Sequence, residues 1–455
     1  MCDPRWVDTL ELAITNVAHG GVFVARHDGR VVFVADTMPG ERVRARITDD
    51  AHASFWRAET VEVLEASLHR VPHIWSAASI DRDPENRAGG AEFGHIALEH
   101  QRELKSRVIA DALERMAALR MPVAVEAVAG DDESGGTGWR TRVRLHVDDD
   151  GRVGPFAARS HRVIPVDDLP LATSALQAEA PLRERMPGVA SIDVVAPSVG
   201  PVRVQVNTDD DRSAGKTGRG TRNARRARSA RPAPRAAQTA RERGAGQSRG
   251  GEAADRIHER VGGRQFALDV GGFWQVHRSA PVVLTAAVQQ AIDEALFEPQ
   301  AANLDLYGGV GLLAAAVGDR FGATTRITTV ESNSRATDFA AENLAEWVGA
   351  SAVTERTERY VARLVASAGA AERARLRAGT VVLDPPRSGA GKAVVGALGA
   401  LRPAQVVYVA CDPVAFARDA ALLAAEGYGI RAIRAFDLFP GTHHVELVAT
   451  LVPER

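Results

Sequence analysis

A chain of 455 residues is too long for one hydrophobic core, so two or three domains are expected. Hydrophobic residues make up 45% and charged residues 25%, an ordinary composition for a soluble protein. No long apolar run and no basic flank before an apolar stretch is present, which argues against a membrane span and an export signal. Two cysteines cannot form a disulfide framework, and a cytoplasmic location is expected.

The net charge of −2 conceals a strongly basic segment. Residues 212–249 hold about a dozen Arg and Lys, a single Glu and almost no large apolar side chains. Such a segment cannot bury enough surface to fold, so an Arg-rich disordered insert is expected at about 208–256. It is either a contact for RNA or a neutral insertion in a surface loop.

The first 68 residues predict a small β-barrel of the oligonucleotide-binding type. Short alternating runs in "LELAITNVAHGGVFVARHDGRVVFVADTMPGERVRARITD" are broken at glycine-containing turns, and "FWRAETVEVLEAS" adds one more strand. The region 69–267 predicts a central α+β domain. It contains one clear helix, "EHQRELKSRVIADALERM", and a stretch beginning "GWRTRVRLHV" that is typical of a β-meander.

From residue 268 to 455 strands and helices alternate. "ANLDLYGG", "ITTVES", "TVVLDPP", "QVVYVACD" and "HHVELVATLV" are expected strands, most of them separated by Ala-rich helices. This alternation predicts a doubly wound, mostly parallel α/β sheet of the Rossmann kind. Ligands of such sheets bind at the carboxyl ends of the strands.

The segment "LDLYGGVGLLAAAVG" predicts a site for a nucleoside cofactor. A strand ends in Asp305, glycines at 308, 309 and 311 make a turn, and a helix follows. Twenty residues past Gly311 the next strand ends in Glu331, whose carboxylate suits two ribose hydroxyls. NAD and S-adenosylmethionine both fit these features, and a structural corner is the simpler alternative.

The segment "VVLDPPRSGAG" favours S-adenosylmethionine. Asp384-Pro385-Pro386 forms a rigid turn, because proline fixes φ and removes a donor, and it is expected to hold an exposed carboxylate over the cleft. Asp-Pro-Pro at this place is commoner in S-adenosylmethionine enzymes than in dehydrogenases. The alternative is a plain break between strand and loop.

Cys411 follows the apolar run "VVYVA", where a cysteine is usually buried filler. It also precedes "DPVAFARDAALL", which is typical of a helix with Pro413 in its first turn. The N-terminus of that helix is expected to favour the thiolate. Cys411 is therefore a candidate nucleophile.

Taken together, these motifs resemble the RNA uridine-C5 methyltransferases that act on tRNA or 23S ribosomal RNA. The matching segments are "FWQVHRSA", "LDLYGGVGL", "VES", "LDPPRSG", "YVACDPVAFARD" and "LFPGTHHVELVATL". The resemblance extends to the N-terminal barrel, which is of the TRAM type in this family, and to the "GWRTRVRLHV" stretch.

The resemblance implies a role for each matching residue. It implies that Gln275, Tyr307, Glu331 and Asp384 contact S-adenosylmethionine, that Cys411 is the nucleophile and that Glu446 is the base. The implied product is 5-methyluridine. Arg387 either binds phosphate or supports the base.

The chemistry explains why those residue types are needed. Carbon 5 of uracil is a poor nucleophile, but a thiolate that adds to carbon 6 leaves an enolate whose carbon 5 can attack a methyl donor. The adduct keeps its carbon 5 proton, so a carboxylate must remove it before the thiolate leaves. Methylation of an amino nitrogen needs neither group.

Some relatives in this family bind an iron–sulfur cluster through four cysteines, and this chain departs from them. Val71, Ala88, Ala91 and Leu169 occupy the matching places. Because thiolates are needed to hold such a cluster, neither a cluster nor another metal is expected. Iron in the purified protein, or absorption near 400 nm, would contradict this expectation.

Two other functions are compatible with parts of the sequence. An amino-group methyltransferase could use "DPPR" to hold a nitrogen, and a non-catalytic RNA-binding protein could retain the pocket. The first leaves Cys411 and Glu446 without a role. RNA is the expected partner, with no membrane contact and no obligate protein partner.

Overall fold

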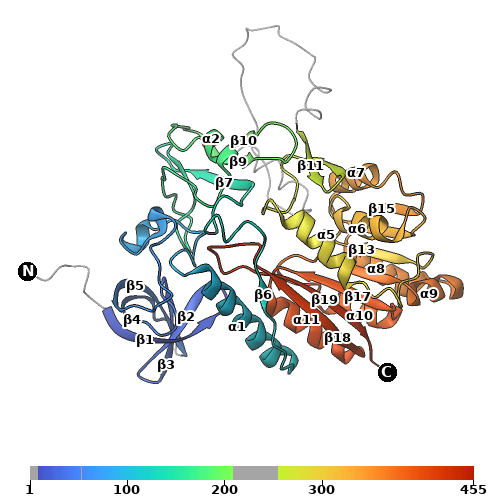
Figure 1. Cartoon of the computed structure of the whole chain (residues 1–455), viewed down its shortest axis with the longest axis horizontal. Helices are drawn as coiled ribbons and strands as arrows, with labels where there is room; N and C mark the ends of the chain where they lie inside the picture. The colour runs from blue at the N-terminus through green and yellow to red at the C-terminus, as the bar shows by residue number, and fades with distance from the viewer. Residues whose placement is uncertain (1–8, 53, 209–254, 455) are drawn as a thin grey trace, which may run out of the picture.

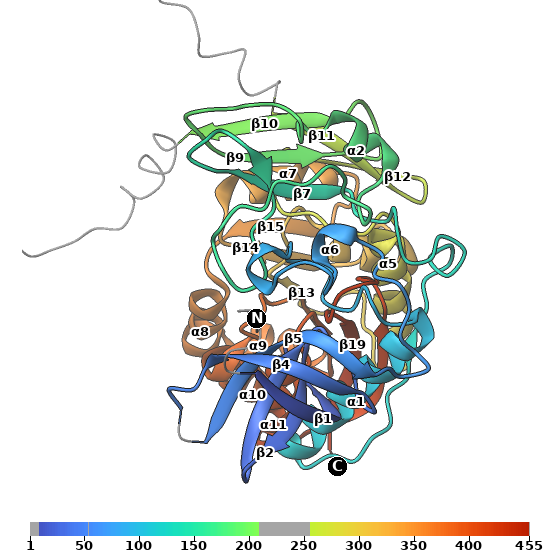
Figure 2. The same cartoon turned by 90° about the vertical axis from the view of Figure 1, so that its left-hand side faces the viewer.

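The computed structural model describes residues 9–52, 54–208 and 255–454 (Figure 1). Nearly all of the expected Arg-rich insert, at about 208–256, lies outside the described residues. Figures 1 and 2 show a barrel and a four-stranded sheet at opposite ends of the molecule, both beside a larger sheet.

The N-terminal segment forms a closed five-stranded barrel, as predicted. Its strands follow the order β1-β2-β3-β5-β4: β1 (Thr9–Ala18), β2 (Val22–His27), β3 (Arg30–Ala35), β4 (Arg42–Asp49) and β5 (Phe55–Glu65). Alternate residues point inward, so that Leu12 and Ile14 of β1 are buried while Glu11 is exposed. The same core reaches Leu104 of helix α1 (Leu98–Ala117).

The central region forms a four-stranded antiparallel sheet and short helical turns. The sheet has the order β10-β9-β7-β8: β7 (Arg142–Val147), β8 (Val153–Gly154), β9 (Val189–Val195) and β10 (Arg203–Thr208). Three short helices flank it: η2 (Ser76–Ala78), η3 (Pro84–Asn86) and α2 (Ser174–Glu179). The meander prediction is wrong in part, since within the predicted stretch the segment after β8 makes only isolated bridges such as Phe156 with Val163.

The C-terminal half contains an eight-stranded sheet of order β15-β14-β13-β16-β17-β19-β18-β6. Its strands are β6 (Val125–Glu126), β13 (Asn303–Leu306), β14 (Ile327–Glu331), β15 (Ala350–Thr354), β16 (Thr380–Leu383), β17 (Gln405–Ala410), β18 (Tyr428–Phe436) and β19 (Glu446–Pro453). Five neighbouring strands, from β15 to β17, are parallel, and β19 enters antiparallel beside β17. A separate hairpin, β11 (Arg256–Val261) and β12 (Arg264–Asp269), precedes this half.

Helices cover both faces of the eight-stranded sheet, as expected for a doubly wound fold. One face packs against α1, α8 (Thr357–Ser367), α9 (Ala370–Arg377), α10 (Gly391–Leu401) and α11 (Pro413–Ala425). The other packs against α5 (Ala280–Ala291), α6 (Leu312–Phe321) and α7 (Ser334–Asn343). No helix among the described residues is long and apolar enough to cross a membrane.

Helix α1 connects the barrel to the C-terminal half, because it packs on β1, on β6 and on α11. Lys105 of this helix is buried and donates to Asp437 Oδ1 at 2.5 Å and to the Phe439 carbonyl at 3.1 Å. A buried ion pair of this kind fixes two segments that lie 332 residues apart. The loop before β19 is therefore held against the barrel side of the molecule.

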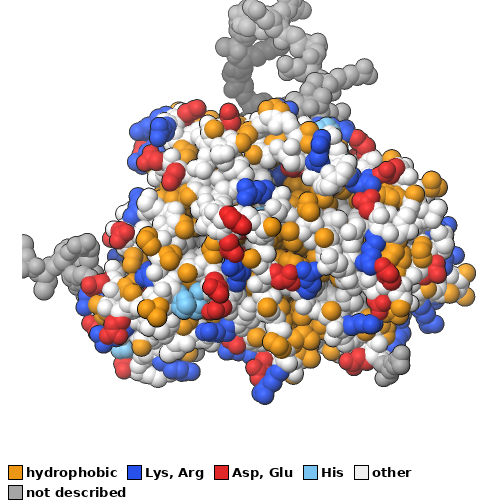
Figure 3. All heavy atoms as spheres, viewed as in Figure 1, with side chains coloured by type: hydrophobic (Ala, Val, Ile, Leu, Met, Phe, Trp, Pro, Cys, Tyr) orange, Lys and Arg blue, Asp and Glu red, His pale blue; other side chains and the backbone are white. Residues whose placement is uncertain are grey.

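Charged side chains on the face drawn in Figure 3 are interspersed. Lys and Arg alternate there with Asp and Glu and do not gather into one large basic patch. The structure of this face therefore does not point to a broad cationic surface.

Candidate active site

Five of the six predicted site residues lie in a row at one edge of the eight-stranded sheet. Each stands at the end of its strand, on β14, β13, β16, β17 and β19 in spatial order: Glu331, Tyr307, Asp384, Cys411 and Glu446. This is the carboxyl edge of the parallel strands, and β19 begins there because it runs antiparallel. The sheet thus gathers residues that are up to 139 positions apart in the chain.

Cys411 and Glu446 face each other at that edge. Ala410 of β17 pairs with Leu447 of β19 in the last ladder position, so the next opposing residues are Cys411 and Glu446. Opposing residues in an antiparallel pair have Cα atoms about 5 Å apart. Cys411 is half-buried, and the Glu446 side chain is buried. A thiol and a carboxyl group therefore meet at one point.

The electrostatic surroundings of Cys411 differ from the sequence-based expectation. Burial, followed by the charges of Glu446 and Asp384, raises the pKa of the Cys411 thiol to about 12. Cys411 does precede α11, but the Asp412 carboxylate already accepts from the Val414 and Ala415 N–H groups at that helix end. The expectation that the helix favours the thiolate is therefore wrong on balance, because burial and the neighbouring carboxyl groups outweigh the helix N-terminus.

The two carboxyl groups beside Cys411 also have raised pKa values. Burial, and then the charge of Asp305, raises the pKa of Asp384 to about 7. Burial and the charge of Asp384 raise the pKa of Glu446 well above its usual range, while Arg387 opposes this shift. The prediction of an exposed Asp384 carboxylate is corrected, because the residue is half-buried against these neighbours. A raised pKa makes a carboxylate a stronger proton acceptor.

The glycine turn after β13 has the close packing that a nucleoside site needs. A side chain at Gly308 would lie 1.9 Å from Thr329 Oγ1 and 2.5 Å from Asp305 Oδ2, so only glycine fits. The Gly309 N–H donates to Glu331 Oε2 at 3.3 Å, which ties the turn to the acidic end of β14. Tyr307 itself has φ of +64°, a strained conformation for a non-glycine residue at this edge.

Gln275, the sixth predicted site residue, does not stand at the end of a strand of this sheet. It follows β12 on a loop anchored to the four-stranded sheet, where the Val276 carbonyl accepts from the Thr141 N–H at 2.8 Å. Within the described part of the chain, its side chain has no hydrogen bond to the other predicted residues.

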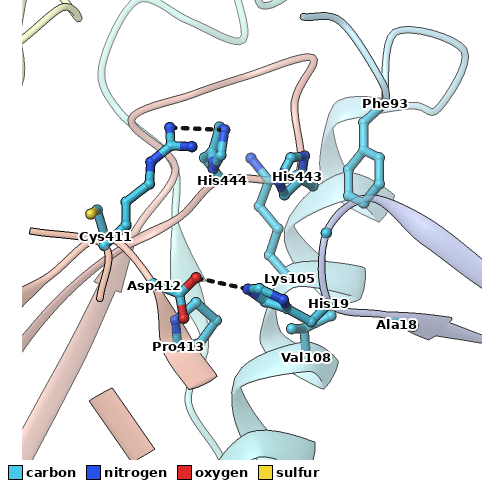
Figure 4. A pocket seen from close by; sticks show the side chains of 12 residues that line it. Ala18, His19, Phe93, Lys105, Val108, Cys411, Asp412, Pro413, His443 and His444 are labelled. Atoms are coloured by element: carbon cyan, nitrogen blue, oxygen red, sulfur yellow. Dashed lines mark hydrogen bonds and ion pairs between the residues drawn. The ribbon is translucent and has the colours of Figure 1, made fainter. Parts of the chain in front are cut away.

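A cavity of about 110 Å³ opens beside Cys411 at the boundary between the barrel and the C-terminal half (Figure 4). The turn after β1 contributes His19 to this cavity, and α1 contributes Lys105. Phe93, which precedes α1, also lines it, and the loop before β19 contributes His443 and His444. Sequence reasoning missed these residues. "THHVE" lay within a recognised motif, but nothing local marked His19 or Lys105 as neighbours of Cys411.

Arg387 also lines this cavity and is exposed. Its guanidinium donates to His444 Nε2 at 3.2 Å. Burial, together with the charges of His443 and Arg387, lowers the pKa of His444 to about 3, so its ring is neutral and accepts this bond.

The places of the missing cluster cysteines are largely apolar and filled. Ala88, Ala91 and Leu169 are buried in one hydrophobic cluster, and Val71 is half-buried nearby in the sequence. Across the described ranges, no group of three or more His, Cys, Asp or Glu is arranged to hold a metal ion. The absence of an iron–sulfur cluster stays a prediction.

Two family models match the chain. The TRAM domain matches residues 7–59, and the tRNA (Uracil-5-)-methyltransferase family matches residues 294–452. These ranges coincide with the barrel and with most of the eight-stranded sheet.

Relatives and a solved structure agree with these matches. An uncharacterized RNA methyltransferase of Streptomyces avermitilis is 37% identical over 97% of this chain and 98% of its own. One of Bifidobacterium longum is 32% identical over 96% and 95%. The Pyrococcus abyssi tRNA (uracil-54, C5)-methyltransferase in complex with S-adenosyl-L-homocysteine shares the fold, with a TM-score of 0.62 and 20% identity over 97% of this chain and 100% of that chain.

The doubly wound sheet, with its antiparallel β19 and glycine turn, thus defines a methyltransferase fold carrying an N-terminal barrel. The chain belongs to the RNA methyltransferase family in which a TRAM domain precedes a tRNA (uracil-5-)-methyltransferase domain.

Proposed function

We propose that this protein transfers a methyl group from S-adenosylmethionine to carbon 5 of a uridine in tRNA or ribosomal RNA. The observation that carries the proposal is the opposition of Cys411 and Glu446 at the ends of β17 and β19. A nucleophile and a proton acceptor at one point are what this reaction requires, whereas methylation of an amino nitrogen needs neither.

The residues around the glycine turn fit S-adenosylmethionine. Asp305 Oδ1 is buried and, among the described residues, lacks a hydrogen-bond partner, while Glu331 is half-buried at the edge of the sheet. Glu331 would accept from the ribose hydroxyls, and Tyr307 and Asp384 would contact the rest of the cofactor, with Gln275 as a further contact. When bound, the cofactor supplies an electrophilic methyl group and a positive sulfonium charge.

Two residues of the protein take part in the reaction itself: Cys411 forms a covalent bond to the uracil, and Glu446 accepts a proton from it. Cys411 loses its thiol proton to solvent and adds as the thiolate to carbon 6 of the uracil, and the electron pair of the carbon 5–carbon 6 double bond moves to make carbon 5 nucleophilic. After methylation, Glu446 accepts the proton of carbon 5. The electrons of that C–H bond restore the double bond, and the carbon 6–sulfur bond breaks to release Cys411 and 5-methyluridine.

The target uridine must leave its stack to reach Cys411, because carbon 6 is covered in stacked RNA. The uridine would enter through the cavity at the barrel boundary, since Cys411 and Arg387 both line it. Arg387 would meet a phosphate or the base there. Flipping costs about a few kcal/mol and is least costly in a loop.

The proposed roles divide the chain into three domains. Residues 1–68 form the RNA-binding barrel, 69–267 the central domain with the Arg-rich insert, and 268–455 the methyltransferase domain. The described barrel strands end at Glu65, which supports the first boundary. The central region also supplies β6 to the eight-stranded sheet. The second boundary therefore divides the sequence but does not separate two independently packed domains. A cytoplasmic location stays a prediction.

Glu331→Gln is expected to raise the KM for S-adenosylmethionine about tenfold and to change kcat little. Gln keeps the shape but replaces one carboxylate oxygen by an amide, and a hydrogen bond to a charged group contributes about 1.5–3 kcal/mol. Initial rates at varied cofactor concentration measure this. Glu342→Ala on the exposed side of α7 is the matched control, and an unchanged KM in Glu331→Gln would remove this residue from the site.

Nucleoside mass spectrometry of tRNA and ribosomal RNA from a deletion strain tests the proposed function. One RNA fraction is expected to lose 5-methyluridine at a single mapped uridine, and the wild-type gene is expected to restore it. Loss of an N-methylated base instead would favour the amino-group reaction. Unchanged methylation in every fraction would favour a non-catalytic RNA-binding role.

A further inference from the structure

The turn between β1 and β2 brings the barrel into the active-site cavity. Ala18, His19 and Gly20 of this turn line the same cavity as Cys411, as Figure 4 shows for the labelled residues. A side chain at Gly21, which has φ of +72°, would lie 2.9 Å from His443 Nδ1. The turn therefore packs against the loop that precedes Glu446 as well as against the segment of Cys411.

His19 makes a direct contact with the residue after the nucleophile. Its Nε2 lies 2.8 Å from Asp412 Oδ2, across 393 positions of sequence. The other oxygen of Asp412 accepts from the Val414 and Ala415 N–H groups at 3.0 and 2.8 Å. One carboxylate thus joins the barrel to the start of α11, and Cys411 is the residue immediately before it.

The charges around this contact give it an electrostatic consequence. Asp412, together with Glu446 and Asp384, disfavours the Cys411 thiolate. The hydrogen bond that His19 donates to Asp412, together with the charge of Asp412, outweighs burial and raises the pKa of His19, which favours the imidazolium. An imidazolium on Asp412 offsets one of the negative charges beside the thiol.

Other titratable groups face the same cavity from different elements. Lys105 comes from α1, Arg387 from the segment after β16, and His443 and His444 from the loop before β19. Lys105 is committed to Asp437, and Arg387 contacts His444. Among the described residues that line this cavity, His19 is the one that pairs with Asp412.

We propose that His19 is a positioning residue, through which the RNA-binding barrel fixes the Cys411–Asp412 turn and completes the active site. The kinetic consequences of this proposal rest on the proposed function, whereas the contact between His19 and Asp412 does not depend on it. It assigns the barrel a part in catalysis beyond holding RNA. RNA bound to the barrel would then be coupled to Cys411 through the hydrogen bond between His19 and Asp412.

Kinetics of His19→Ala and His19→Gln test the proposal. His19→Ala is expected to lower kcat about tenfold and to leave the KM for RNA within about twofold, because a small misplacement of a reacting group costs rate. His19→Gln keeps a donor for Asp412 and is expected to restore most of kcat at neutral pH. His27→Ala, at the opposite end of β2, is the matched control and is expected to behave like the wild type.

The pH dependence separates positioning from simple packing. Below its raised pKa His19 is protonated and pairs with Asp412, and the charge is lost as the pH rises through that pKa. The ratio of wild-type to His19→Ala rates is therefore expected to be larger at about pH 6 than at about pH 9. The ratio of His19→Gln to His19→Ala rates is expected to stay constant, since neither variant titrates there.

Alkylation of Cys411 by iodoacetamide gives a readout that does not depend on methyl transfer. In a Cys2→Ser background without RNA or cofactor, His19→Ala is expected to slow alkylation about threefold at about pH 7, because Asp412 is left unpaired. Slower alkylation in a protein that methylates no uridine would keep the positioning role and overturn the proposed function. Equal alkylation and equal kcat in His19→Ala, or a raised KM for RNA alone, would overturn the positioning role.

Discussion

Cys411→Ala is expected to lower the rate of methyl transfer by about four orders of magnitude or more, because no other group can add to carbon 6. RNA affinity is expected to stay within about twofold of the wild type, since flanking contacts dominate binding. Single-turnover methylation with labelled cofactor measures the rate, and a filter-binding assay measures the affinity. Because Cys411 is half-buried, removing its sulfur atom is expected to leave the fold intact.

Cys2→Ser is the matched control, since the sequence has only these two cysteines. It is expected to retain full activity. Activity remaining in Cys411→Ala at more than a few per cent would show that the reaction does not pass through this thiol. An amino-group methyltransferase would give that result.

Glu446→Gln is expected to trap the protein on its RNA as a covalent adduct. Cys411 can still add and carbon 5 can still be methylated, but the proton of carbon 5 has no acceptor and the thiolate cannot leave. Loss of a general base costs about 10²–10⁴ in rate. The adduct is expected as a slow band on denaturing gels, formed only when S-adenosylmethionine and RNA are both present.

The raised pKa of Glu446 is consistent with this role, because a carboxylate of high pKa is a strong proton acceptor. Release of product at the wild-type rate by Glu446→Gln would mean that another group or water takes the proton. The neighbouring carboxylate of Asp384 is the alternative that such a result would indicate.

The motifs at strand ends were sufficient to predict the edge of the sheet. Glycine turns, Asp-Pro-Pro and Cys-Asp-Pro each follow an apolar run, and parallel strands bring such ends together. The barrel was also predictable, because alternation and turns are local signals. Both depend on residues close in sequence.

Features set by distant pairing could not be predicted. β6 has two residues and pairs with β18 about 310 positions away, and no local pattern marks so short a strand. β18 mixes small, apolar and arginine residues, and β15 is short and mixes small apolar residues with Ser and Thr. The antiparallel entry of β19 places Glu446 opposite Cys411, and only the register of the ladder reveals this.

The electrostatics of Cys411 required the packed structure for the same reason. The sequence shows a helix after the cysteine, but the carboxyl groups that raise the thiol pKa come from β16 and β19. Likewise, His19 reaches Asp412 from the far end of the chain. Charge at an active site is a sum over neighbours in space, which local patterns do not contain.

The most direct test of the account is to locate the covalent bond in the RNA adduct of Glu446→Gln. After nuclease and protease digestion, tandem mass spectrometry is expected to find a methylated uridine attached to the sulfur of Cys411, and Glu446→Gln combined with Cys411→Ala is expected to give no adduct. A link at any other residue, or an adduct that persists in the double variant, would contradict the account.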